Sequence, residues 1–327
     1  MDSSTGNTNI QSAFLGQIRN KIGDSISFAD ELAELLNVSR DSAYRRIRGE
    51  TVLSLDEVKK LYDQYSLSID AIMSPNSNMV SINHKNIDFH YSVKEWLNSL
   101  IQNLELAKSS KDLELIFAAK DFPVFNYFRF PEMAAFKLFV WSKSIIQDPQ
   151  YEHSIYCPDI MPREIMADAA RAWSLYSSVA STEIWSDEVV NSTIKQIEFY
   201  YECGFFSHRN QVSELYDCIL EIIKLSRAEA SEGKKSEGGS FELYQNEILI
   251  PDNTIYARIQ GQQVVFINYN TMDILTTQQK SFCDKTKVYM TNLIKNSALI
   301  SATAEKERNR FFNKLEEKIT TSINRLP

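Results

Sequence analysis

The sequence contains little glycine and proline and has no net positive charge, and each of these features excludes a class of protein. Only 9 of the 327 residues are glycine and 8 are proline, while 18 are Phe and 15 are Tyr. The chain is therefore neither collagen-like nor of low complexity, and it can bury a large core. The 43 acidic residues outnumber the 35 basic ones, for a formal net charge of −8. Such a chain does not hold nucleic acid or an anionic membrane through bulk charge, so any contact with nucleic acid must be local.

Disulfide, metal and membrane signals are also missing. The four histidines show no spacing that places two ligands on one helix face, and no C-x-x-C occurs among Cys157, Cys203, Cys218 and Cys283. Scattered thiols of this kind fit a reducing compartment. No window reaches about 18 uncharged apolar residues, and the amino terminus lacks the pattern of an export signal. We expect a cytoplasmic protein that binds no metal, no cofactor and no membrane.

Catalytic motifs are absent as well. The sequence contains no G-x-S-x-G, no phosphate-binding glycine loop and no dinucleotide fingerprint. Two S-x-x-K matches, at Ser192 to Lys195 and at Ser231 to Lys234, lack the partner motifs that give this pattern a catalytic meaning. We therefore expect a protein that is not an enzyme.

The first part of the chain predicts a small helical domain. Residues 1–9 are small and polar, so we expect a disordered tail. Helical spacing then yields five short helices within residues 10–73. Ser39 is a suitable N-cap for a helix over residues 40–48, and a capping box at Ser54 opens the next one. Residues 74–90, which begin SPNSN, are predicted to be a linker.

The remaining residues, 91–327, predict a larger helical domain with a small antiparallel β-sheet. The β-rich segment is residues 241–270, read as a hairpin that turns at Gly261 or as a three-stranded sheet. A flexible, charged loop is expected at residues 231–240, SEGKKSEGGS. Helical patterns cover residues 92–119, 131–147, 162–179, 187–203 and 209–230, followed by a helix to about residue 296 and another over about 301–324. The fold class is thus mainly α.

The helix over residues 40–48 carries a concentrated positive charge. On a helical wheel Ala43 and Ile47 point inward, whereas Asp41, Ser42, Arg45 and Arg48 point outward, with Tyr44 and Arg46 beside them. Four Arg minus one Asp give residues 39–48 a charge of +3, whereas 8 basic minus 10 acidic residues give residues 10–73 a charge of −2. Arginine can bond a guanine edge or a phosphate, Ser and Tyr can bond phosphates, and Asp41 can accept from cytosine or orient an Arg.

Two stretches, LAELLNVSRDSAYRRIRGE and LSLDEVKKLYDQYSLSID, resemble the helix-turn-helix domain of the lambda-repressor and Cro-type regulators. The sequence departs from that family at Asn37, where Gly is usual, and at Arg46, where the residue is generally apolar. It also lacks the Gln that often opens the first motif helix. The resemblance implies that helix 40–48 reads the major groove. The predicted DNA-binding residues are Ser39, Arg40, Asp41, Ser42, Tyr44, Arg45 and Arg48.

The rest of the chain resembles the long carboxy-terminal region of uncharacterised helix-turn-helix regulators of Bacteroidetes-type bacteria, which implies a bacterial transcription factor. We expect a homodimer that binds double-stranded DNA, with residues 91–327 serving dimerisation or the sensing of an unknown small molecule or peptide. The alternative is a protein- or peptide-binding protein whose helix-turn-helix is not its main activity.

Two features of the larger domain, its aromatic segment and its last helix, each allow two interpretations. Eight aromatic residues within 122–141 favour a core, although they could also line a pocket. The apolar stripe of the last helix favours packing on its own domain over a dimer seam.

Overall fold

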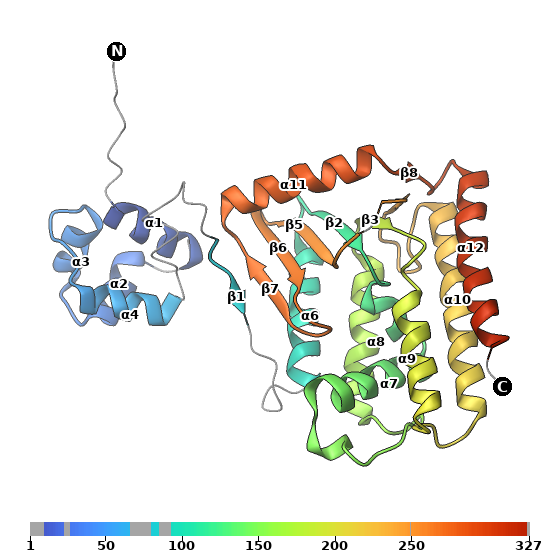
Figure 1. The fold of residues 1–327 in the computed structure, drawn as a ribbon. Coiled ribbons are helices and arrows are strands. Elements are labelled where there is room, and N and C mark those ends of the chain that lie inside the picture. The colour runs from blue at the N-terminus through green and yellow to red at the C-terminus, as the bar shows by residue number, and fades with distance from the viewer. Residues whose placement is uncertain (1–9, 23–26, 66–79, 85–92, 249, 326–327) are drawn as a thin grey trace. The chain divides into compact units, whose positions relative to one another are not determined.

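The computed structural model describes residues 10–22, 27–65, 80–84, 93–248 and 250–325 (Figure 1). It divides into two compact units, residues 1–81 and 82–327, which we describe separately. The described residues are mostly helical and also form one mixed sheet. Among them, no helix is both long and apolar enough to cross a membrane. The predicted tail, residues 1–9, lies outside the described residues.

The described part of unit 1 consists of four helices around a small core. They are α1 (Ile10–Ile22), α2 (Phe28–Leu36), α3 (Arg40–Ile47) and α4 (Leu55–Tyr65). The buried members of the core are Phe14, Leu15, Ile18, Leu32, Leu36, Ala43, Leu53 and Leu61. Gln11 ties α1 to the segment after α3, because its amide donates to the carbonyls of Arg46 and Thr51 and accepts from the N–H of Leu53. The fifth helix predicted before residue 73 falls outside the described residues.

Unit 2 is built on a mixed sheet with the strand order β1-β7-β6-β5-β2-β3-β4-β8. Strands β2, β3 and β4 run parallel, and the other neighbours are antiparallel. The strands are β1 (Asn83–His84), β2 (Glu114–Ala119), β3 (Ser181–Trp185), β4 (Phe241–Gln245), β5 (Thr254–Ile259), β6 (Gln262–Asn268), β7 (Ile274–Thr277) and β8 (Ala298–Leu299).

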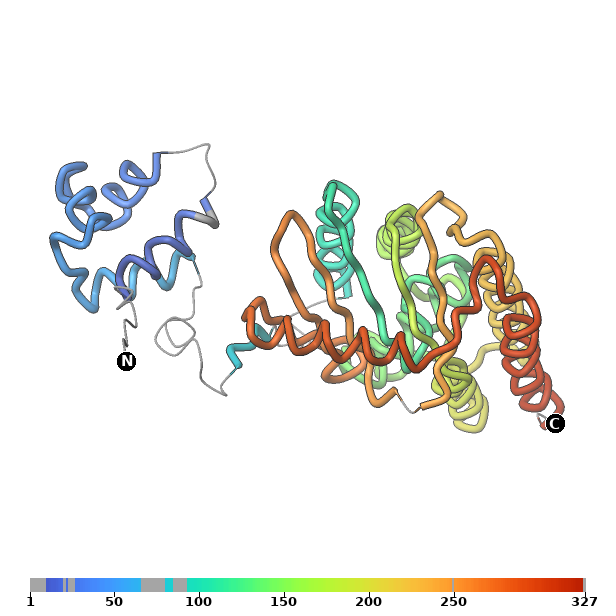
Figure 2. The backbone as a smooth tube through the Cα atoms, turned by 90° about the horizontal axis from the view of Figure 1, so that it is seen from above, coloured from blue at the N-terminus to red at the C-terminus, as the bar shows by residue number. Residues whose placement is uncertain are grey.

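Helices cover both faces of this sheet, as Figure 2 shows from above. α11 lies on one face, where Cys283 and Met290 join Ile116 and Ile184 in one apolar cluster. α6 and α8 lie on the opposite face (Figure 2). The helical segments of unit 2 are α6 (Val93–Ser109), η1 (Val124–Arg129), α7 (Pro131–Val140), η2 (Trp141–Ile146), η3 (Pro149–Tyr151), α8 (Arg163–Ser178), α9 (Asn191–Glu202), α10 (Asn210–Glu232), α11 (Lys280–Lys295) and α12 (Glu305–Ile323).

The sheet differs from the predicted antiparallel one. Residues 114–119 were predicted to end a helix but form β2, and residues 181–185 form β3, so the centre of the sheet is parallel. Both strands are short and mainly buried, and periodicity alone does not separate such a run from a helical segment. The hairpin of β5 and β6 turns at Gln260 and Gly261, both with positive φ. β4 does not extend this hairpin but pairs with β3 and β8, so the predicted three-stranded sheet is wrong.

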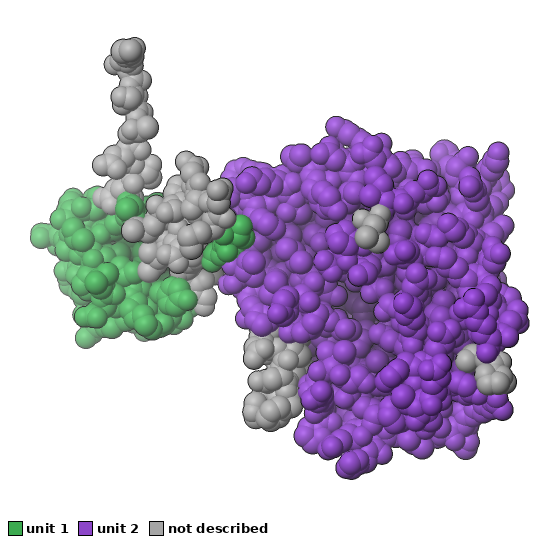
Figure 3. Space-filling model, in the orientation of Figure 1, with its two compact units in different colours: residues 1–81 green, residues 82–327 purple. Residues whose placement is uncertain are grey.

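The boundary between the units falls between Ser81 and Ile82, inside the stretch predicted as a linker (Figure 3). The structure describes residues 80–84 of the predicted linker 74–90, and Asn83–His84 pair with β7 as strand β1. Most of residues 231–240, predicted to be a flexible, charged loop, are exposed, but two of them are buried. Lys235 is 5% exposed, and a Cβ on Gly239 would lie 2.6 Å from the Val179 carbonyl oxygen, so these two residues are closely packed.

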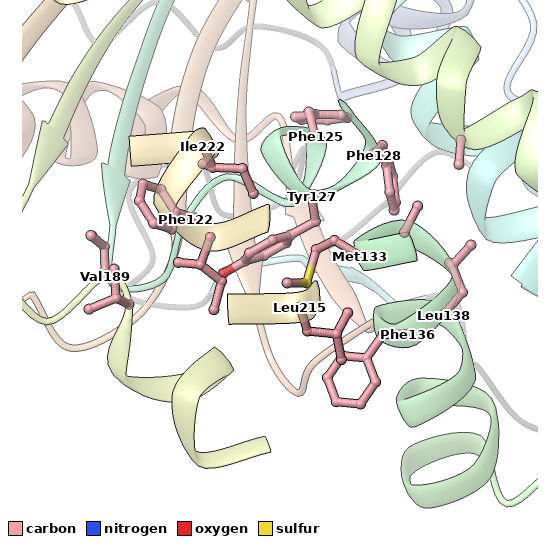
Figure 4. Packing of buried hydrophobic residues seen from close by; sticks show 14 of the residues in the cluster. Phe122, Phe125, Tyr127, Phe128, Met133, Phe136, Leu138, Val189, Leu215 and Ile222 are labelled. Atoms are coloured by element: carbon pink, nitrogen blue, oxygen red, sulfur yellow. The ribbon is translucent and has the colours of Figure 1, made fainter. Parts of the chain in front are cut away.

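The aromatic residues of 122–141 belong to the main core of unit 2. Figure 4 shows Tyr127 and Met133 pointing into the space between η1, α7 and α10, where Phe122 and Ile222 meet them. The last helix also packs on its own unit: α12 lies along α10 and buries Phe311, Phe312, Leu315 and Ile319. Its apolar stripe therefore does not form a dimer seam.

Candidate nucleic-acid interface

The turn between α2 and α3 is short and is closed by backbone hydrogen bonds. Asn37 adopts a left-handed conformation with φ 56° and ψ 50°, and its N–H donates to the Glu34 carbonyl over 3.2 Å. The N–H of Val38 donates to the Ala33 carbonyl over 2.9 Å. Asparagine tolerates this conformation better than most residues, so Asn37 can stand where glycine is usual. α3 begins after only three intervening residues.

Ser39 caps α3 as predicted. Its hydroxyl oxygen accepts from the backbone N–H of Ser42 over 3.2 Å, and the two hydroxyl oxygens are 2.9 Å apart. The cap satisfies one of the N–H groups that a helix start leaves without a partner. Both serines of the predicted set thus stabilise the start of the helix.

The remaining predicted residues occupy the outer side of α3. Ala43 is completely buried, and Ile47 packs against the core of unit 1. Side chains on the other side of the helix are exposed, namely Arg40, Asp41, Tyr44, Arg45 and Arg48. The inward and outward sides of the predicted helical wheel are therefore those of the structure.

Each exposed arginine of α3, and Arg48 at its C-cap, has an acidic partner. Arg40 lies 2.9 Å from Asp30, Arg45 lies 3.3 Å from Asp41, and Arg48 lies 2.7 Å from Glu50. The Arg48 hydrogen bond lowers the pKa of Glu50, and the coulombic attraction of Arg48 and Arg45 acts in the same direction. The charge of +3 counted along the sequence is therefore offset by Asp30 on α2 and by Glu50 just beyond α3.

Arg46 has a structural role that the sequence pattern did not reveal. Its guanidinium donates to both carboxylate oxygens of Glu57, over 3.3 and 2.7 Å, and also to the Ser42 carbonyl. Arg46 and Glu57 are each 15% exposed. Burial of Glu57 opposes its ionisation, but the hydrogen bonds from Arg46 and from the Ser54 N–H lower its pKa below the ordinary value. Arg46 thus links α3 to the capping box of α4, which explains a charged residue at a usually apolar position.

Comparisons with known proteins add no relative: no family model, no curated protein and no solved structure matches this chain. Within the described ranges, no three His, Cys, Asp or Glu side chains gather as a metal site, and all four cysteines are free thiols.

Proposed function

We propose that the chain binds double-stranded DNA through unit 1, with α3 in the major groove, and regulates transcription without catalysing a reaction. The observation that carries this proposal is the pair α2 and α3. A three-residue turn joins them, and α3 buries Ala43 while it presents polar side chains outward. A helix of this kind fits the major groove of B-DNA, which is about 12 Å wide. The resemblance to lambda-repressor and Cro-type regulators supports the same function.

The outer residues of α3 suit separate tasks in the groove. Arg45 and Arg48 can reach guanine edges, and the hydroxyl groups of Ser39, Ser42 and Tyr44 can bond phosphates or bases. Asp41 lies 3.3 Å from Arg45 and can hold that guanidinium in one orientation. Arg40 lies over the Tyr44 ring, 5.8 Å from its centroid. We therefore assign Arg45 to base recognition and Arg40 to the phosphate backbone.

The ion pairs of α3 determine how such binding works. Exposed pairs contribute only about 0–1 kcal/mol each, so opening them on contact with DNA costs little. Their carboxylates nevertheless stay close to the DNA and weaken the attraction of the phosphates. Binding by the outer side of α3 therefore depends more on its contacts with the bases of one DNA sequence than on its net charge.

A second candidate is a protein- or peptide-binding protein whose helix-turn-helix is not its main activity. This second candidate is favoured by the pairing of Arg40, Arg45 and Arg48 with acidic residues, because the pairing leaves the outer side of α3 without a strongly basic surface. Selection of bound sequences from a random DNA library distinguishes the two. We expect one enriched sequence, and a library that stays random would favour the second candidate.

Replacing Arg45 by Ala tests base recognition. We expect Arg45→Ala to weaken binding to the selected sequence by roughly 1–3 kcal/mol, with a smaller effect on unrelated DNA, because a base contact is lost. Lys59→Ala is a matched control, since Lys59 is also an exposed cation with an acidic partner four residues away. Equal losses on all DNA sequences in titrations of Arg45→Ala would assign this residue to a phosphate instead.

Glu50 is expected to restrain DNA binding. It accepts from Arg48 over 2.7 and 3.1 Å, and Glu50→Gln removes this negative charge beside the DNA, so that Arg48 loses its counter-ion. We expect tighter binding to all DNA and a slope of log K against log salt concentration steeper by about 0.9, the share of one added phosphate contact. Asp63→Asn, which removes the partner of Lys59 on α4, is the control and should change neither quantity. An unchanged salt slope for Glu50→Gln would place Arg48 away from the DNA.

A further inference from the structure

Unit 2 contains a cavity of about 280 Å³ at the carboxyl end of β2. It is enclosed by residues of α6, β2, η1, α7 and the segment that joins β6 to β7. This volume is close to the lower end of the range of about 300–1,000 Å³ that small-molecule sites occupy. The cavity is therefore large enough for a compact organic ligand.

Aromatic side chains form much of the cavity wall. Trp96, Phe117, Phe122, Phe125 and Trp141 all line it, and all are buried. Figure 4 shows Phe122 and Phe125 near Tyr127, which also lines the cavity. Flat, apolar walls favour a ligand with a flat, apolar body.

A buried ammonium faces this aromatic wall. Lys137 of α7 is 3% exposed, and its Nζ donates to Gln196 Oε1 over 2.6 Å and to Thr193 Oγ1 over 3.2 Å. Nζ lies 4.4 Å from the centroid of the Tyr127 ring. These partners are uncharged, and among the described residues Lys137 forms no ion pair with a carboxylate. The ammonium retains one donor hydrogen and an uncompensated charge.

A carboxylate lines the same cavity. Asp121 follows β2, and Asn253 fixes its backbone by accepting from the N–H groups of Lys120 and Asp121. The Asp121 side chain has no hydrogen bond or ion pair within the described part of the chain. Burial raises its pKa, while Lys137 and Lys120 oppose the shift. Burial likewise lowers the pKa of Lys137 to about 8, and Asp121 raises it. The two charges thus influence each other without touching.

The cavity is accessible from the surface of unit 2. A more open hollow of about 650 Å³ shares Lys120, Asp121, Ser192 and Gln196 with it. The exposed side chains of Ile145 and Phe199 line this outer hollow. The face of unit 2 drawn in Figure 3 has a hollow near its middle. Asp121 lines both hollows, whereas Lys137 lines only the inner cavity.

We propose that this cavity binds a small zwitterion with a flat apolar body, that is, an aromatic α-amino acid. Its carboxylate accepts from Lys137, its ammonium donates to Asp121, and its ring lies against the aromatic wall. A simple acid would leave Asp121 unpaired and repelled, and a simple amine would leave Lys137 in the same position. This inference does not depend on DNA binding.

Calorimetric titration of the full chain tests the inference with three related compounds. L-Phenylalanine carries both charges, 3-phenylpropionate lacks the ammonium, and phenethylamine lacks the carboxylate. We expect L-phenylalanine to bind, and each of the other two to bind at least roughly tenfold more weakly, because a charge-assisted hydrogen bond is lost. No heat of binding with L-phenylalanine, or equal affinity for all three compounds, would overturn the proposal.

Variants assign each charge to its residue. Asp121→Asn should remove the preference for L-phenylalanine over 3-phenylpropionate, and Lys137→Met should remove its preference over phenethylamine. Asp217→Asn, a change at an exposed aspartate of α10, is the control and should keep both preferences. Asp121 is only half-buried, so Asp121→Asn decides the matter even if Lys137→Met does not fold. Unchanged preferences in Asp121→Asn would overturn the assignment.

Discussion

Replacing Glu183 by Gln is expected to lower the free energy of unfolding by about 3–5 kcal/mol, the range for breaking a buried ion pair by removing one partner. Glu183 on β3 is 1% exposed. Its carboxylate lies 3.5 Å from Lys235 Nζ and also accepts from the Tyr176 hydroxyl, the Ser181 hydroxyl and the Trp185 indole N–H. The Gln side chain preserves the shape of this site but leaves the Lys235 charge buried without a counter-ion.

The surroundings of Lys235 explain why the loss should be large. Its ammonium donates to the carbonyls of Tyr176 and Val179 and lies 3.5 Å from the centroid of the Tyr176 ring. Gly239 is held against the same Val179 carbonyl with no room for a side chain. The segment that follows α10 therefore cannot move the charge into solvent without leaving its site on β3 and α8.

The loss should also depend on pH. Burial lowers the pKa of Lys235 and Glu183 raises it, so Glu183→Gln lowers the pKa of Lys235 further below its value in the unfolded chain. Between the folded and the unfolded pKa of Lys235 the unfolded chain binds more protons than the folded one, so stability rises with pH. This rise begins at a lower pH in the variant than in the native protein, because the folded variant has the lower Lys235 pKa. The difference between variant and native protein should therefore be larger at pH 6 than at pH 9.

Urea denaturation at the two pH values measures both effects. Glu242→Gln is the matched control, because Glu242 is an exposed carboxylate on the neighbouring strand β4 and should change stability by less than about 0.5 kcal/mol. A loss below about 1 kcal/mol for Glu183→Gln would mean that water reaches Lys235 in the folded protein.

Local signals in the sequence were enough to predict α3 and its neighbours. Ser39 caps its own helix three residues ahead, and Asn37 makes its turn with carbonyls only a few residues back. The sheet hairpin is equally local, since Gln260 and Gly261 turn the chain within two residues. Each of these features depends on residues that are neighbours in the sequence, so residue type and spacing carry the information.

The features that were missed depend on partners distant in the sequence. Lys235 lies in a polar, glycine-rich stretch whose composition predicts a loop, and its ion-pair partner, Glu183, lies 52 residues earlier in the sequence. The ion pair of Arg46 with Glu57 and that of Arg40 with Asp30 likewise join different helices. The aromatic segment that contains Lys137 has a spacing that fits a core, and the cavity beside it is lined by residues from several elements that are distant in the sequence. Such contacts follow from the tertiary fold and not from local preference.

Removing one half-site from the selected DNA is expected to weaken binding by the full chain by roughly 10²–10⁴-fold, because two linked contacts reinforce each other. The ion pairs of α3 make this dependence strong. Arg40, Arg45 and Arg48 are each compensated, so one copy of unit 1 should bind near the non-specific range of about 10⁻⁴–10⁻⁶ M. Strong binding then needs two copies held together, which we assign to unit 2.

The geometry of the DNA provides the control. Two copies related by a two-fold axis read an inverted repeat whose half-sites lie about one helical turn, about 34–36 Å, apart. Inserting half a helical turn between the half-sites keeps every base contact available but places the second half-site on the opposite side of the duplex. Binding to this DNA should fall to the level of a single half-site.

Sedimentation of the full chain, free and on its selected DNA, measures the assembly directly. We expect a dimer at micromolar concentration in both cases. The interface should lie on unit 2 outside the apolar stripe of α12, because Phe311, Phe312 and Leu315 are already buried against its own unit. A monomer in both experiments, together with a selected site that contains no repeat, would show that a single α3 supplies the affinity, and the exposed ion pairs would then have to open fully on DNA.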